Sequence, residues 1–533
     1  MTPSSSPQSS SQDLVPFKPK QLRRFYEPIV LFKALNDISR DQGNVRSPDH
    51  PQKPQNEAER FRLFLDKIAS VCDQKRGGDN VTAVTVLDQE DAFLYVFACN
   101  QASTPGLLKK ASFLSSLLNK VSGYKGLNTT EKTKAREKIV NFILIFNRPR
   151  IELYLNGLRE ELRNCLKSCE QRSQHEISKV ERCLLGLEKS IRDINLDKSI
   201  IETDYLESCL YCLGEINDFR KAVKKASITK FIDKQADEGR VADYKSMACW
   251  SQFRHHLTRL QAYERAVTAF VAAENEWPEL FQEVKVLAVP SSQPIKNPLG
   301  KKSEEAQNIA GRMGGAQPEI ERYKNLVRRL EPDPYGINAR IRKLCGSDSF
   351  KPIVHCEVLV LNWILAQDTE PEFFKRCRYI GTSKGTCKLC HYYFEADPSS
   401  IKVRPTHGNV YAKWRFPDLH RADGNAGVAR RQSIFNLMMD NIRRDAVSIL
   451  EDKSPTGKTN DSGTYTFISE TRSDLEVEAG GSDPSEVEDL AEQLDAELSF
   501  TSTSTSDSLV ISDSDDDDDD DVIEADFSSK VLA

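Results

Sequence analysis

A long stretch of helical periodicity limits the fold of this chain more than any other feature. From residue 105 to about residue 330, apolar residues recur at steps of three and four, the spacing that places side chains on one face of a helix. The clearest row is Ile151, Leu155, Leu158, Leu162, Cys165 and Cys169. Since a half-buried strand has a period of two, the sequence predicts an all-α helical bundle over residues 105–345, interrupted by a loop at 290–300.

The segment before the bundle has a different pattern. Residues 59–104 begin with a helical pattern and continue with two β-branched and aromatic runs, 81–86 and 93–99, which predict a β-hairpin. Residues 1–58 contain polar, proline-containing stretches around a short apolar helical piece at 25–35. They are predicted to form a loosely ordered N-terminal extension.

The segment after the bundle, residues 346–450, again mixes the two periods. Two predicted helices lie among short β-type runs, and an amphipathic helix is predicted at 425–450. The β-type runs are 352–354, 378–381, 401–404 and 409–411. Strands and helices in one short segment predict an α/β unit.

The net charge of −6 conceals two parts of opposite charge. Residues 451–533 hold 25 acidic and 4 basic side chains, whereas residues 1–450 hold 70 basic and 55 acidic ones. The acidic tail is rich in Ser, Thr and Asp and is predicted to be disordered, because it buries too little apolar surface to offset the entropy of ordering. Since the rest of the chain is basic, its charge does not exclude an anionic partner.

The composition excludes several classes of protein. The longest apolar runs, such as residues 139–146, are far shorter than the ~18–20 residues of a membrane span. Residues 1–12 lack an apolar core, so no secretory signal is predicted. The 13 cysteines are odd in number and scattered, which favours reduced thiols. We therefore expect an intracellular protein of the cytoplasm or nucleus without membrane association.

One group of residues has the composition of a metal site. The sequence H-C-E at 355–357 is followed about thirty residues later by C-K-L-C at 387–390. Imidazole and thiolate groups are zinc ligands, and a catalytic zinc site has three protein ligands and one position left for water. The predicted zinc ligands are therefore His355, Cys387 and Cys390, with the two cysteines on one face of a helix.

Two further residues complete the predicted site. Thr386 is the predicted N-cap of the helix that holds the cysteines, and the positive end of that helix favours thiolate over thiol. His355 is predicted to precede a helix over residues 356–367. Glu357 cannot share the side-chain row of His355, so it is the predicted catalytic residue, a carboxylate that moves a proton from the metal-bound water to a leaving amine. The alternatives are a purely structural zinc site and a chance pairing of the cysteines.

These residues match the H-x-E and C-x-x-C pattern of zinc-dependent nucleobase deaminases. The region 350–417 more closely resembles a deaminase-like domain family known mainly from large fungal proteins, within the cytidine-deaminase superfamily. The matching runs are V-H-C-E (354–357), Y-I-G-T-S-K (379–384), C-K-L-C (387–390) and T-H-G-N-V-Y-A-K-W (406–414). The resemblance implies a mixed sheet flanked by helices, one Zn²⁺ ion held by His355, Cys387 and Cys390, and hydrolytic deamination with Glu357 as proton shuttle. The proline of the wider superfamily is Thr386 here.

A deaminase sheet begins with a β-hairpin, and residues 332–354 do not contain two strand patterns. The hairpin at 81–99 does, so in one hypothesis it starts the deaminase sheet and the bundle 105–345 is an insertion. Asn100, directly after the second strand, then resembles the asparagine that contacts substrate in superfamily members. In the alternative, residues 59–104 are an independent α/β unit and Asn100 is an ordinary strand-end cap.

Two downstream residues are further candidates for substrate binding. His407 and Trp414 are predicted to line the pocket, Trp414 by stacking on a base. Each has a structural alternative, because a histidine beside glycine is usually a turn residue and a lone tryptophan is usually in the core.

The predicted fold is therefore an α/β deaminase-like domain combined with a large helical bundle and a disordered acidic tail. The predicted function is zinc-dependent deamination of a nucleobase in a nucleoside, nucleotide or nucleic acid. The alternative is a catalytically inactive, zinc-stabilised scaffold that binds proteins through its bundle and tail. In the tail, Leu509, Val510 and Ile511 precede an acidic run and resemble a SUMO-interaction motif, which predicts a SUMO-like partner. A merely solubilising tail is the other interpretation.

Overall fold

The computed structural model describes residues 13–41, 54–170, 175–196, 200–238, 245–299, 304–346, 350–367, 369 and 371–452. Apart from Glu451 and Asp452, the predicted disordered tail lies outside these residues, as does its motif at 509–511. Within the described part, no helix is long and apolar enough to cross a bilayer.

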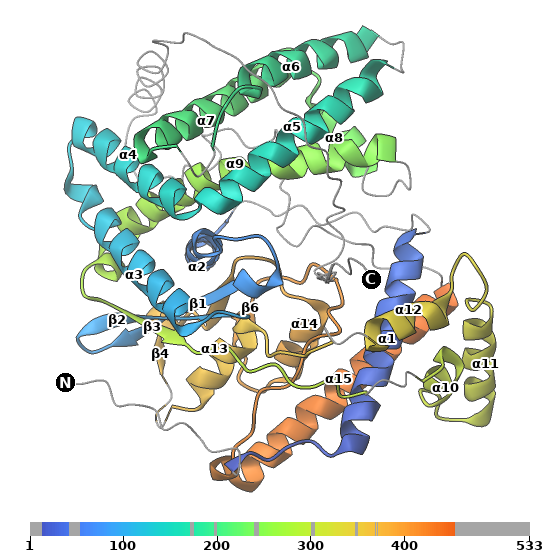
Figure 1. Ribbon diagram of the computed structural model, residues 1–533. Coiled ribbons are helices and arrows are strands. Elements are labelled where there is room, and N and C mark those ends of the chain that lie inside the picture. Colours follow the sequence, from blue (N-terminus) through green and yellow to red (C-terminus); the bar gives the residue numbers. More distant parts are fainter. Residues whose placement is uncertain are drawn as a thin grey trace, which may run out of the picture.

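A mixed sheet lies between two groups of helices (Figure 1). The strands in spatial order are β3 (Val284–Val289), β2 (Ala92–Cys99), β1 (Thr82–Gln89), β5 (Tyr379–Thr382) and β6 (Lys402–Val403), and β4 (Glu372–Phe373) pairs with β1 beside β5. β1 is antiparallel to β2, β4 and β5, whereas β2–β3 and β5–β6 are parallel pairs. The predicted hairpin is therefore present, with a register that runs from Thr82 opposite Cys99 to Gln89 opposite Ala92.

The hairpin separates two hydrophobic cores. The side chains that face the first core are Val84, Val86, Tyr95 and Phe97. Those that face the second are Ala83, Leu87, Val96 and Ala98. Because successive side chains of a strand point to opposite faces, this alternation gives the sheet a buried surface on both sides.

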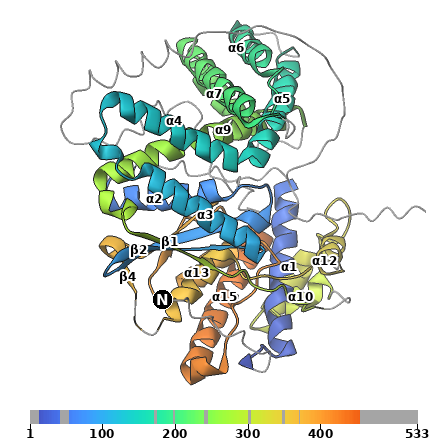
Figure 2. The same cartoon turned by 60° about the vertical axis from the view of Figure 1, so that its left-hand side comes forward.

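The predicted helical bundle lies on the side of the first core (Figure 2). Its helices are α3 (Thr104–Val121), α4 (Thr129–Phe146), α5 (Arg148–Glu170), α6 (His175–Ile191), α7 (Glu202–Lys225), α8 (Thr229–Glu238) and α9 (Lys245–Glu276). The apolar row on α5 that predicted this bundle is buried. Helix α2 (Glu57–Cys72) packs on the bundle through α9 and on the sheet through β1 and β5.

The second core is covered by the remaining helices. They are α1 (Pro19–Asp41), α10 (Ala306–Gly311), α11 (Gln317–Arg328), α12 (Ile337–Gly346), α13 (Cys356–Leu365), α14 (Lys388–Ala396) and α15 (Gly424–Asp452). The expectation of a loosely ordered extension at 1–58 is wrong for α1, because Phe25, Ile29 and Phe32 are at most 2% exposed and lie in this core. α1 packs against α12 and α15.

The predicted bundle boundary at residue 345 is also too far along the chain. β3 is a strand within that range and pairs in parallel with β2. Beyond β3, α10 and α12 contribute Ile309 and Ile341 to the second core, on the other side of the sheet from α3–α9. The chain therefore leaves the bundle at β3 and crosses to the opposite face.

The position of the hairpin distinguishes the two hypotheses for residues 81–99. β1 pairs with β5, with Ala83 opposite Thr382 and Val84 opposite Gly381. The hairpin thus shares a sheet with the strand that precedes the two cysteines, as the insertion hypothesis requires. Along the chain, the bundle lies between β2 and α13.

Candidate metal centre

Two helix starts bring the predicted zinc ligands together. His355 directly precedes α13 and has an extended backbone conformation (φ −73°, ψ 152°). α13 is largely apolar and packs on β1, β2 and β5, so the sheet fixes the position of His355. Cys387 directly precedes α14, and Cys390 lies in the first turn of that helix.

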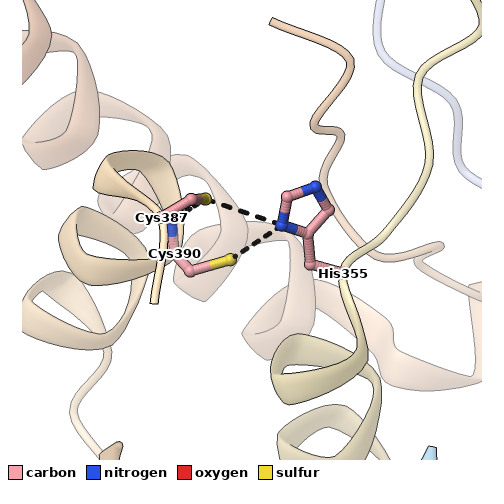
Figure 3. Close-up of side chains that lie close together, drawn as sticks. All are labelled: His355, Cys387 and Cys390. Carbon is pink, nitrogen blue, oxygen red and sulfur yellow. Dashed lines mark hydrogen bonds between the residues drawn. The ribbon is translucent and has the colours of Figure 1, made fainter. Parts of the chain in front are cut away.

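The donor atoms of these three side chains point toward one another (Figure 3). His355 Nδ1 lies 3.5 Å from Cys387 Sγ and 3.4 Å from Cys390 Sγ, and all three atoms lie within 4.8 Å of one another. In a tetrahedral zinc site with ordinary bond lengths, nitrogen and sulfur ligands are about 3.5 Å apart. The cluster can therefore hold a metal ion, and its donor types and spacing fit zinc.

Both sulfur atoms accept N–H hydrogen bonds from the protein. The backbone N–H of Cys390 donates to Cys387 Sγ at 3.4 Å, and Trp414 Nε1–H donates to Cys390 Sγ at 3.2 Å. Burial alone raises the pKa of Cys387, but its hydrogen bond with Cys390 and the proximity of His355 lower this pKa well below the usual thiol range. Such donors stabilise thiolate, the form that binds metal.

The predicted N-cap of α14 is wrong by one residue. Cys387 occupies the cap position, and its sulfur accepts the N–H that a capping oxygen normally accepts. Thr386 is 1% exposed, and its hydroxyl donates to the Arg404 carbonyl at 3.0 Å. Thr406 Oγ1 in turn donates to the Thr386 carbonyl at 2.9 Å. Thr386 therefore connects the segment that precedes Cys387 to the segment after β6 through two hydrogen bonds.

Glu357 lies in the first turn of α13 and is 4% exposed. Cys356 Sγ–H donates to Glu357 Oε2 at 3.3 Å, and the carboxylate also hydrogen-bonds to the Cys390 side chain. The predicted proton shuttle is thus beside the donor cluster but is not one of the three grouped donors.

Asn100 lies at the start of α13, although it is 256 residues away in sequence. Its Oδ1 accepts the N–H of Cys356 at 2.8 Å, and its Nδ2 donates to the Gly78 carbonyl at 2.8 Å. The side chain is 6% exposed. Asn100 therefore lies next to the metal cluster, as the insertion hypothesis expects, and it also has the capping contacts that the alternative expects.

Trp414 does not have the environment of a base-stacking residue. It is 0% exposed, so neither face of its indole is open to a base. Its ring packs among Phe25, Tyr393 and Phe416. The expectation that Trp414 stacks on substrate is corrected, because its indole is part of the second core and its N–H contacts a metal-ligand sulfur.

His407 has the contact of a turn residue. Its Nδ1 accepts the N–H of Asn409 at 3.0 Å. The His407 ring is 5.7 Å from the ring of Tyr411, which is 6.3 Å from the ring of His355. Tyr411 therefore lies beside the metal cluster. It was not among the predicted site residues, although it belongs to the 406–414 run that resembles the deaminase-like family.

Ser292 is a supporting residue that the sequence analysis missed. Its hydroxyl accepts the N–H of Val354, the residue before His355, at 2.9 Å. Gln101, next to Asn100, donates through Nε2 to the Ser292 carbonyl at 2.8 Å. No local sequence pattern predicts this role of Ser292, because the contact forms only when the segment after β3 packs beside the residue that precedes His355.

Comparison with known proteins agrees with this geometry. A family model described as an OTT_1508-like deaminase matches residues 354–418, which include His355, Glu357, Cys387 and Cys390. No curated protein and no solved structure matches the chain. The chain therefore contains a deaminase-like domain with a histidine–cysteine–cysteine cluster that can hold a metal ion.

Proposed function

We propose that this protein is a zinc-dependent hydrolase that removes the exocyclic amine of a nucleobase. The observation that supports this most is the position of Glu357, which lies beside three convergent metal donors inside the residues that match a deaminase family. One histidine, two cysteines and a non-ligand glutamate are the residues that zinc deaminases of nucleobases use.

Each residue has a distinct task in the proposed reaction. His355, Cys387 and Cys390 would hold the ion, and bound zinc supplies a Lewis acid that lets water lose a proton near neutral pH. Glu357 takes this proton on its carboxylate and delivers it to the amine nitrogen. The C–O bond forms and the C–N bond breaks, so the water oxygen replaces the amine, which leaves as ammonia. Cys356 and Asn100 keep Glu357 and the first turn of α13 in place.

The proposed substrate is a cytosine- or adenine-type base in a nucleoside, nucleotide or nucleic acid. A planar base has an aromatic neighbour available in Tyr411, whose ring lies beside that of His355. The 70 basic and 55 acidic side chains of residues 1–450 also favour an anionic substrate over a cationic one.

A substrate panel tests this proposal. The zinc-loaded protein should release ammonia from at least one member of a panel of cytidine, adenosine, their monophosphates, and single-stranded DNA and RNA. Cys387→Ser, which removes a metal ligand, should lose both zinc and ammonia release. Stoichiometric zinc without ammonia from any member of the panel would contradict the proposal and favour a zinc-stabilised scaffold.

A further inference from the structure

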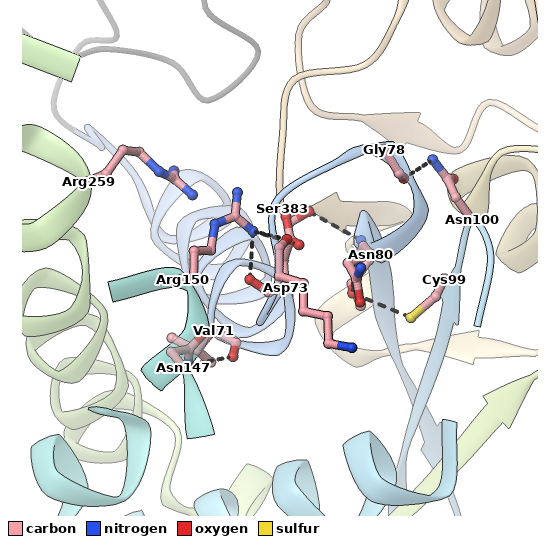
Figure 4. A network of polar contacts seen from close by, with 12 residues as sticks. Val71, Asp73, Gly78, Asn80, Cys99, Asn100, Asn147, Arg150, Arg259 and Ser383 are labelled. Carbon is pink, nitrogen blue, oxygen red and sulfur yellow. Dashed lines mark hydrogen bonds and ion pairs between the residues drawn. The ribbon is translucent and has the colours of Figure 1, made fainter. Parts of the chain in front are cut away.

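A second cluster of polar groups lies where the bundle meets the sheet, away from the metal donors. Arg150 of α5 and Arg259 of α9 lie in this region (Figure 4), and both contact Tyr154 of α5. Arg150 Nε–H donates to the Tyr154 hydroxyl at 2.6 Å, and Arg259 Nε–H donates to the same oxygen at 3.1 Å. The two arginines are 4% and 8% exposed, so two guanidinium groups converge on one phenol in a largely buried place.

Arg150 is paired with a carboxylate and two backbone carbonyls. Its Nη1 lies 2.6 Å from Asp73 Oδ1 and donates to the carbonyls of Asp73 at 2.6 Å and of Lys75 at 3.2 Å. Asp73 is 0% exposed. Among the described residues, the carboxylate that pairs with these arginines, Asp73, is bound by Arg150.

Arg259 lacks such partners. Within the described part of the chain, its Nε–H bond to Tyr154 is the one hydrogen bond the guanidinium makes, and its terminal nitrogens have no acceptor. The neighbouring His255, whose ring is 6.1 Å from that of Tyr154, has an Nδ1 closed off from solvent and without a hydrogen-bond partner. Burial of a charged group without a counter-charge is unfavourable by several kcal/mol, so a bound anion would stabilise this arrangement.

The pKa shifts of His255 and Tyr154 also indicate positive charge around this cluster. Burial lowers the pKa of His255 well below its usual range, and the positive charges of Arg259, Arg150 and Lys384 lower it further. The adjacent His256 has a pKa lowered to about 4, so it is neutral near neutral pH. Burial alone raises the pKa of Tyr154, but the two arginines lower it to about 8. While Tyr154 is protonated, Arg150 and Arg259 thus carry more positive charge than Asp73 balances, among the residues that the structure describes.

We propose that this cluster binds an oxyanion of the phosphate class, with the terminal nitrogens of Arg259 as its principal donors. A guanidinium group presents a planar fork of N–H donors that matches two phosphate oxygens. His255 adds a ring nitrogen without a hydrogen-bond partner, and the positive charge of Lys384 acts on that ring. The phosphate belongs to a separate ligand that stabilises the fold, and the test below distinguishes it from a phosphate on the substrate.

The site is connected to the metal centre through the chain. Asp73 begins the loop that contains Gly78, and Gly78 accepts the hydrogen bond of Asn100, which caps α13. Lys384 precedes the metal-ligand Cys387 by three residues. A bound anion would therefore stabilise the two loops that position His355 and Cys387, whether or not the metal centre is catalytic.

Two measurements on the full chain test the inference, with Arg259→Gln as the variant and Arg163→Gln, an exposed arginine on α5, as the matched control. The first is phosphorus content per chain after purification in phosphate-free, nucleic-acid-free buffer. The second is the thermal unfolding midpoint in inorganic pyrophosphate against sodium chloride of equal ionic strength. Wild type and Arg163→Gln should retain phosphorus or show a saturable rise in midpoint, and Arg259→Gln should bind at least about tenfold more weakly.

Two further variants keep the test decisive. If Arg259→Gln does not fold, Arg259→Lys is the substitute variant. It retains the positive charge but lacks the planar pair of guanidinium N–H donors, so it should also bind pyrophosphate more weakly than wild type. Cys387→Ser should keep the pyrophosphate response of wild type, and a response lost in this variant would assign the phosphate to the substrate and overturn the separate site. The absence of both phosphorus and a pyrophosphate-specific rise in wild type, or an unchanged response in Arg259→Gln, would overturn the inference altogether.

Discussion

At the scale of single residues, the N–H of Trp414 has the most specific consequence for the metal site. Its contact with Cys390 Sγ at 3.2 Å reduces the charge on a ligand sulfur. Trp414→Phe keeps the aromatic bulk in the core but removes the donor, so we expect metal retention to weaken by roughly tenfold, as for other groups that support metal ligands. Competition with a zinc chelator measures this directly.

A cobalt-substituted sample provides an independent measurement for the same variant. Loss of the donor leaves the Cys390 sulfur richer in electrons, so the sulfur-to-cobalt charge-transfer absorption should move to lower energy. Trp363→Phe is the matched control, because Trp363 is a half-buried tryptophan on α13. Equal chelator competition and equal spectra for the two variants would show that the Trp414 contact has no influence on the metal.

The residue pattern predicted the metal ligands but not the residues that hold these ligands in position. His355, Glu357, Cys387 and Cys390 follow a spacing that is visible in the sequence, and the structure groups the three donors. Ser292 and the N–H of Trp414 act through contacts with residues far away in the chain, which no local spacing reveals. The sequence left Trp414 as either a stacking residue or a core residue, because an aromatic side chain in a motif has the same sequence signature whether it faces a ligand or the core.

At the scale of elements, the close approach of α2 to β5 depends on a glycine. A Cβ at Gly381 would lie 2.6 Å from Leu65 Cβ and 2.7 Å from the Leu65 backbone carbon, so alanine would force the helix away from the strand. We expect Gly381→Ala to lower the free energy of unfolding by about 1–3 kcal/mol, the usual cost of overpacking. Denaturant unfolding measures this change.

Gly186 in α6 provides the control for this prediction. A Cβ there would meet nothing within 4 Å. Gly186→Ala should therefore leave stability unchanged or raise it by up to about 1 kcal/mol, because alanine favours a helix over glycine. If both substitutions had the same effect, the packing of α2 on β5 would not depend on Gly381.

Periodicity predicted long elements well and short or mixed ones poorly. The α5 row has a clear apolar face, and it is buried as expected. α1 was predicted only as a short helical piece at 25–35, because polar and charged residues flank its buried run at 25–32 and Pro28 lies inside it. β3 was missed because a six-residue strand within a long helical region is identified by its pairing with β2, which the local sequence does not contain.

At the scale of the whole molecule, the deaminase-like domain is completed by distant segments. The matched residues 354–418 supply the metal donors, but β1 and β2 of the same sheet come from before the bundle, and Asn100 caps α13 from there. The sequence predicted this return of the chain as one of two hypotheses. It did not predict the crossing at β3 or the buried cations between bundle and sheet, because both depend on how α5, α9 and the sheet pack together.

The measurement that tests the central claim most directly is ammonia release as zinc is added to metal-free protein. With a substrate identified from the panel, ammonia release should rise with zinc and saturate at one zinc per chain. Glu357→Gln should bind the same amount of zinc and release no ammonia, because the amide keeps the shape of the side chain but cannot carry the proton. Ammonia release that is independent of zinc, or equal in wild type and Glu357→Gln, would contradict the account.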